Sequence, residues 1–116
     1  MCRLFIGADP QLWDSSTKSL RIDGMVTSVR LENYFWSILT EISMRDHMNI
    51  PQLLCKLYHE SIDAGHDLGN YSSFLRVCCC RYLALQLSGH IPLDHKIPLS
   101  DVPVEKALSS EAKHIH

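Results

Sequence analysis

Val26, Ser28 and Arg30 alternate along a short segment, so in an extended strand their side chains lie on one face. These residue types suit contacts with the edges of DNA bases. An arginine can donate two hydrogen bonds to a guanine, a serine hydroxyl can donate or accept one, and a valine can contact the methyl group of a thymine. This chemistry requires a strand that presents the face to solvent.

A second group of residues marks a helix start that can hold a phosphate. Asn49 followed by Gln52 has the spacing of a capping box, and Pro51 is well tolerated in a first turn. Free backbone N–H groups and the positive end of the helix dipole favour an anion there. We therefore expect Asn49 and Ile50 to anchor a phosphate.

The charge of the chain says little about its partner. The sequence has 11 Lys and Arg against 13 Asp and Glu, a formal net charge of −2 with neutral histidine. A protein that binds nucleic acid through bulk charge is usually basic, so DNA binding here depends on where individual cations lie. Lys18 and Arg21 precede the alternating segment and are expected to contact phosphates.

Two short strands are expected to carry these cations. Leu20 and Ile22 alternate with polar neighbours, and Asp23-Gly24 is typical of a turn. Alternation resumes over residues 26–31, which predicts the second strand. The side chains expected on its other face, toward the helices, are Thr27, Val29 and Leu31.

Three helices are expected after the strands. Apolar residues spaced by three and four predict a first helix over residues 33–46 and a second over 50–64. Asn70 can cap a third helix over residues 71–87. The apolar residues of the third helix lie nearly all round it, which suits a subunit interface.

A second copy of the chain is expected, because a lone hairpin leaves a row of backbone groups unpaired and two helices cannot cover both of its faces. One strand from each copy would pair across a two-fold axis, with four helices beneath. A two-stranded antiparallel ribbon is one of the few elements that fit the major groove of DNA. The residues expected in the dimer core are Val29, Leu31, Trp36, Leu39 and Ile42.

In this order, the motifs resemble the ribbon-helix-helix superfamily of bacterial DNA-binding proteins. The segment TSVRLEN (27–33) is followed by an amphipathic helix and then by MNIPQLL (48–54). The branch that the chain resembles most has a third helix like residues 70–83 and an opening similar to MCRLF. The resemblance covers residues 1–88.

The resemblance implies a mainly α protein with a short β-ribbon, an intertwined homodimer and an extra C-terminal helix. It also implies sequence-specific binding of double-stranded DNA and regulation of transcription, commonly as a repressor. Carried over by residue, Val26, Ser28 and Arg30 occupy the base-contacting positions, and Asn49 and Ile50 the phosphate-binding helix start. Family ribbons often carry more than one basic or amide residue, whereas this ribbon strand has one strong candidate, the arginine.

The chain divides by composition into an N-terminal leader (1–17), the ribbon-helix-helix domain with its third helix (18–88) and a proline-interrupted, flexible tail (89–116). A short helix is expected near residues 104–112 of the tail. No apolar run approaches the roughly 18–20 residues that span a bilayer, and the start does not have the pattern of a secretory signal. We expect a soluble, cytoplasmic protein without a membrane partner.

The five cysteines suggest free thiols in a reducing compartment, because the three consecutive ones at 78–80 cannot all pair. No histidine lies within four residues of them, so no metal or other cofactor is expected, and small core residues are the preferred interpretation. Cys2 would become N-terminal after removal of Met1, as in amidotransferases with an N-terminal nucleophile. The chain is too small for such a site, and no enzyme is expected.

An interaction protein is the alternative. Many small ribbon-helix-helix proteins are antitoxins whose C-terminal segment folds on a toxin, and the tail here offers apolar anchors at Ile97, Leu99, Val102 and Val104. A module that dimerises and binds only protein also fits the nearly neutral ribbon. Assembly of two dimers into a tetramer stays open.

Overall fold

The structure is a computed structural model that describes residues 2–67 and 69–115. Within these ranges the elements are α1 (Cys2–Ile6), the 3-10 helix η1 (Pro10–Leu12), β1 (Ser15–Ile22), β2 (Met25–Glu32), α2 (Asn33–Arg45), α3 (Ile50–Asp63), α4 (Tyr71–Leu87), the 3-10 helix η2 (Leu99–Asp101) and α5 (Val104–Ile115). The hairpin, then α2, α3 and α4, confirms the predicted mainly α fold with a β-ribbon. None of the described helices has both the length and the apolar character needed to cross a membrane.

The hairpin forms within one chain. β1 and β2 are antiparallel, with Ile22 opposite Met25 beside the turn and Ser15 opposite Glu32 at the open end. The turn residues Asp23 and Gly24 have φ of 52° and 80°, the left-handed pair that matches the twist of the two strands. Gly24 adopts this φ without the steric cost that a Cβ brings.

The pairing of β2 with its own copy across a two-fold axis involves a second chain and stays a prediction. Within one chain, β2 pairs with β1, which confirms the two strands and the turn expected at Asp23-Gly24. β1 is longer than the sequence indicated, because it begins at Ser15 rather than near Leu20. Its first residues are polar and do not show the alternation from which a strand was predicted. A second copy can reach β2 only along its remaining edge.

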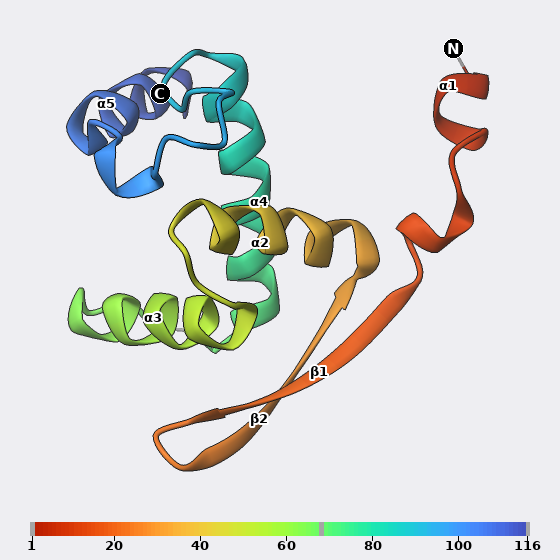
Figure 1. Cartoon of the computed structure of the whole chain (residues 1–116), viewed down its shortest axis with the longest axis vertical. Coiled ribbons are helices and arrows are strands. Elements are labelled where there is room, and N and C mark those ends of the chain that lie inside the picture. Colours follow the sequence, from red (N-terminus) through yellow and green to blue (C-terminus); the bar gives the residue numbers. More distant parts are fainter. Residues whose placement is uncertain (1, 68, 116) are drawn as a thin grey trace.

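The three central helices begin and end close to the predicted residues, and local side-chain caps specify the starts of α3 and α4. Asn49 accepts a hydrogen bond from the Gln52 N–H at 2.8 Å, and the Gln52 side chain accepts one from the Asn49 N–H at 2.9 Å. Asn70 caps α4 by accepting from the Ser73 N–H at 3.1 Å. The hairpin extends away from the helices, with α3 nearest its turn and α5 at the other end of the molecule (Figure 1).

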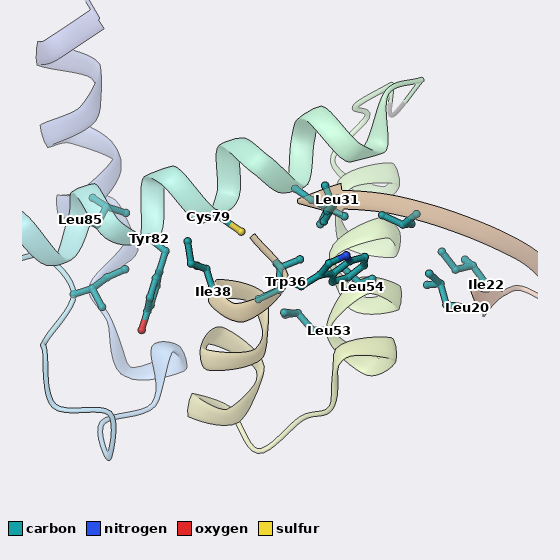
Figure 2. Packing of buried hydrophobic residues seen from close by; sticks show 14 of the residues in the cluster. Leu20, Ile22, Leu31, Trp36, Ile38, Leu53, Leu54, Cys79, Tyr82 and Leu85 are labelled. Atoms are coloured by element: carbon teal, nitrogen blue, oxygen red, sulfur yellow. The ribbon is translucent and has the colours of Figure 1, made fainter. Parts of the chain in front are cut away.

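One core joins the inner face of the hairpin to α2, α3 and α4. Figure 2 shows Leu31, Trp36 and Leu54 gathered where the hairpin meets the helices, with Cys79 of α4 directed toward α2. The predicted dimer-core residues Val29, Leu31, Trp36 and Leu39 are buried, and Ile42 is half-buried, within a single chain. Their burial therefore does not depend on a second copy.

The segment after Gly89 follows a defined course, where the sequence predicted a flexible tail. Arg45, at the end of α2, is only 3% exposed and donates hydrogen bonds to the carbonyls of Pro92, Asp94 and Ile97 at 2.9–3.2 Å. These carbonyls belong to no helix or strand, so a buried guanidinium satisfies them instead. The short helix expected near residues 104–112 is confirmed as α5.

The N-terminal leader contains a helix that the sequence did not indicate. α1 lies at the end of β1 away from the turn and apart from α2 to α5 (Figure 1). The turn expected at Asp9-Pro10 is present, since the Asp9 carboxylate accepts from the Gln11 N–H at 3.0 Å and begins η1.

Candidate nucleic-acid interface

The outer face of the hairpin is the surface turned away from the helices. It consists of three cross-strand pairs: Thr17 with Arg30, Ser19 with Ser28, and Arg21 with Val26. All six side chains are exposed. The intervening residues Leu20, Ile22, Val29 and Leu31 are buried against the helices, so the two faces of the strands alternate between solvent and core along most of their length.

The outer face is mainly polar and carries an arginine toward each end. The Ser19 and Ser28 hydroxyls lie 3.4 Å apart at its centre, where either can donate to the other. Arg21 lies toward the turn, where its Nη1 donates to the Gly24 carbonyl at 3.4 Å. Arg30 lies two pairs away on the other strand, across from Thr17. The face therefore offers two guanidinium groups separated by a hydroxyl pair.

The acidic residues of the hairpin are engaged elsewhere. Arg76 of α4 donates through Nε to the Glu32 carboxylate at 2.9 Å, and this hydrogen bond lowers the pKa of Glu32 below its ordinary value. The Asp23 carboxylate lies 2.9 Å from Nε2 of His59 on α3. Within the described residues, the hairpin cations Lys18, Arg21 and Arg30 form no ion pair. The hairpin surface is therefore more positive than the formal net charge of −2 for the whole chain indicates.

Lys18 lies on the inner side of the hairpin and not on the outer face. It is paired with Val29, and its ammonium group sits 5.4 Å from the centre of the Trp36 ring, a cation–π distance. With Ser19, Leu20, Ile50, Pro51 and Leu54 it lines a surface hollow of about 400 Å³. The structure therefore brings Lys18 beside the start of α3, one of the predicted phosphate positions.

At the start of α3, the capping box limits which donors remain. The Asn49 N–H and the Gln52 N–H are both occupied by the box, and Pro51 has no N–H. The Ile50 N–H has no partner recorded within the described residues, so it is the donor that the first turn offers. Asn49 therefore caps the helix, while Ile50 and Lys18 line the hollow beside its first turn.

Sequence reasoning did not single out Thr17 and Ser19, which the hairpin register adds to the outer face. Their alternation with Arg21 was a usable signal, because residues two apart on a strand share a face. It was missed because the first strand was expected to begin later, and because the base-contacting ribbon was built from the second strand alone.

The cysteines and histidines do not form a further site. Within the described ranges, no group of three His, Cys, Asp or Glu side chains lies close enough to hold a metal. The five cysteines are free. Among the three consecutive ones, Cys79 is buried and burial raises its pKa to about 12, Cys78 is half-buried, and Cys80 is exposed. The expected role as small core residues therefore describes Cys79 but not Cys80.

The comparison with protein families identifies the fold. A family model described as "Ribbon-helix-helix domain" matches residues 15–83, from the first residue of β1 into α4. Because the match covers more than half of the chain, this chain belongs to the ribbon-helix-helix domain family, a non-enzymatic fold of DNA-binding regulators. The resemblance noted in the sequence is confirmed.

A solved structure extends the similarity beyond the matched domain. The chain is similar to an uncharacterized protein from Bordetella pertussis Tohama I, with 42% sequence identity and a TM-score of 0.88. The alignment covers 92% of this chain and 86% of that one. No curated protein matches the chain.

Proposed function

We propose that the outer face of the β1–β2 hairpin binds the major groove of double-stranded DNA, and that the protein is a sequence-specific transcriptional regulator acting as a repressor. The observation that carries this proposal is that Arg30 and Arg21 share one exposed face of a two-stranded antiparallel ribbon with the hydroxyl residues Thr17, Ser19 and Ser28. An element of this width fits the major groove.

Each outer-face residue has a role that its chemistry supports. Arg30 donates to O6 and N7 of a guanine, Ser28 hydrogen-bonds a base edge, and Val26 contacts a thymine methyl group. Arg21, which lies nearer the turn, contacts a phosphate. The Ser19–Ser28 hydroxyl pair can rearrange between donor and acceptor, which suits either base of a pair.

Residues beside the hairpin supply the phosphate contacts that fix the position of the protein along the DNA. Ile50, whose N–H lies at the positive end of α3, and Lys18 line the same hollow. Asn49 acts here through its cap, which holds the first turn in place. Contacts of this kind position a protein on the duplex without specifying sequence.

Two copies acting together fit this function best. A homodimer presents the same residues twice, which doubles the contacts and matches a two-fold symmetric operator. The free thiols suit the reducing cytoplasm of a bacterium. The interaction-protein alternative gains no specific observation, because its anchors Leu99 and Val102 pack against the chain's own core.

Fluorescence anisotropy with the DNA upstream of the protein's own gene, at several salt concentrations, tests the proposal. We expect affinity to fall with salt as a few phosphate-bound counterions are released. Arg30→Ala should weaken binding by about 1–3 kcal/mol, or roughly fivefold to 150-fold, and reduce the preference over unrelated DNA.

The matched control is Lys106→Ala, which removes the same charge from an exposed site on α5 at the other end of the molecule. It should leave affinity within about twofold of the wild type, since a distant charge is screened at ordinary salt. Equal binding by wild type and both variants to any DNA, whatever its sequence, contradicts the proposal.

A further inference from the structure

α5 packs against the C-terminal half of α4 through one of its faces. Val104, Ala107, Leu108 and Glu111 have the spacing of three, four and seven residues that places four side chains on one side of a helix. Arg81 of α4 donates to the Glu111 carboxylate through Nε at 2.8 Å, which ties the two helices together. They meet at the end of the molecule away from the hairpin turn (Figure 1).

A hollow of about 170 Å³ lies between α4, α5 and the segment that contains η2. Its most buried lining residues are Leu85, Ile91 and Ala107, which are 5–8% exposed. Leu99 and Val102 also line it, and both pack against the core. The hollow is therefore built from side chains that the fold already holds in place.

The hollow is open to solvent on the side of α5. Val104 and Leu108 line it there and are 59% and 46% exposed. The described lining residues are seven apolar side chains and one charged one, Arg81. An apolar body with a single anionic group therefore matches the lining.

The Arg81 guanidinium keeps donors for such an anionic group. Its Nε and Nη2 atoms donate to Glu111, whereas no hydrogen bond joins Nη1 to an acceptor among the described residues. A guanidinium has five N–H groups in a fixed fork, and its two ends can each hold a carboxylate. A second carboxylate can therefore bind Arg81 from the side of Nη1.

The volume of the hollow limits the apolar body to a small one. A cavity of roughly 150 Å³ with an apolar lining holds a molecule of the size of benzene. Water finds few hydrogen-bond partners among apolar side chains, so an apolar group displaces it at little cost. A ring or a branched chain of about six carbons fits this volume, whereas a folded peptide segment does not.

From these observations we infer that the hollow between α4 and α5 binds a small organic acid. Its ring or branched chain contacts Leu85, Ile91 and Val102, and its carboxylate binds Arg81. The inference goes beyond the proposed function, because it assigns a ligand to a part of the fold remote from the outer face of the hairpin. Most of the lining residues follow residue 83, where the match to the family model ends.

A methyl NMR titration of the full chain tests the inference with two probes of similar shape, benzoate and the neutral benzyl alcohol. We expect benzoate to shift the methyl signals of Ile91, Val102 and Leu108 and to saturate with a dissociation constant on the order of 1 mM. Benzyl alcohol should bind at least about tenfold more weakly, because it cannot form the charge-assisted hydrogen bonds to Arg81.

Arg81→Gln separates ligand binding from a purely structural role of the arginine. The change should lower the affinity for benzoate to about that for benzyl alcohol, and it should leave the affinity for benzyl alcohol unchanged. If Arg81 serves only to hold α5 through Glu111, the change weakens the binding of both probes alike. That result overturns the inference.

The matched variants Val104→Trp and Leu93→Trp test the location of the site. Both place an indole at an exposed apolar position, 59% and 74% exposed, but only Val104 lines the hollow. We expect Val104→Trp to abolish saturable binding of benzoate by filling the hollow, and Leu93→Trp to bind it as the wild type does. Circular dichroism checks that both variants remain folded.

Either of two further results overturns the inference: a wild type that does not bind benzoate saturably, or equal affinities of the two tryptophan variants. These titrations contain no DNA. Their failure therefore leaves the proposed function untouched, and the Arg30 variant tests that function separately.

Discussion

Arg45 shows how one side chain fixes the path of a segment that has no regular structure of its own. Its guanidinium lies in the core at the end of α2 and hydrogen-bonds three backbone carbonyls of the proline-rich stretch. Nη1 also donates to the Tyr82 hydroxyl at 3.3 Å, and that hydroxyl donates to the Glu41 carboxylate. A guanidinium has five donors in a fixed fork, and these partners use most of them.

Arg45→Met tests this role at the residue scale. The change keeps a long apolar side chain but leaves the carbonyls of residues 92–97 without their donor, so we expect the free energy of unfolding to fall by about 2–3 kcal/mol. Limited proteolysis should cut within this stretch earlier than in the wild type. Arg76→Met, which breaks a partly exposed ion pair, should cost less than about 1 kcal/mol. Equal losses in the two variants contradict the assigned role of Arg45.

At the scale of elements, the ion pair between Arg81 and Glu111 joins α5 to α4. Its hydrogen bond lowers the pKa of Glu111 below the ordinary value of 4.5 and raises the pKa of Arg81. The folded chain therefore binds the Glu111 proton less tightly than the unfolded chain does. The resulting stability is present above pH 4.5 and is lost as the pH falls through the lowered pKa. Glu32, paired with Arg76, contributes with the same sign.

Urea unfolding at pH 7 and at pH 3.5 measures this contribution. We expect Glu111→Gln to be less stable than the wild type at pH 7 by about 0.5 kcal/mol, because Arg81 is 43% exposed and the pair is partly screened. The difference between the two proteins should shrink at pH 3.5. Glu105→Gln, an exposed change in the first turn of α5, is the control. A difference that persists or grows at pH 3.5 contradicts the assignment.

The elements also show which parts of the structure the sequence could specify. The starts of α3 and α4 were predicted because Asn49 and Asn70 cap them through residues three positions away. The course of residues 89–97 was not predicted, because it depends on Arg45, which is some fifty residues earlier in the chain. For the candidate site, alternation predicted that Val26, Ser28 and Arg30 share a face, while the contribution of β1 depended on a register that only pairing defines.

At the scale of the whole molecule, the hairpin separates two environments. Its inner face completes the core with α2, α3 and α4, and its outer face carries the arginines and hydroxyls proposed to contact DNA. The helices contact the hairpin through its apolar side, which leaves the polar side turned away from them.

Two valines of β2 allow a direct test of this arrangement, because they lie on opposite faces of one strand. Val26 is 65% exposed on the outer face, and Val29 is 2% exposed in the core. Methyl NMR spectra recorded while the upstream duplex is titrated into the protein would follow both residues at once. The proposed function predicts a large shift of the Val26 methyl signals that saturates with DNA, and a much smaller one for Val29. Val26 signals that stay unchanged at saturating DNA would contradict it.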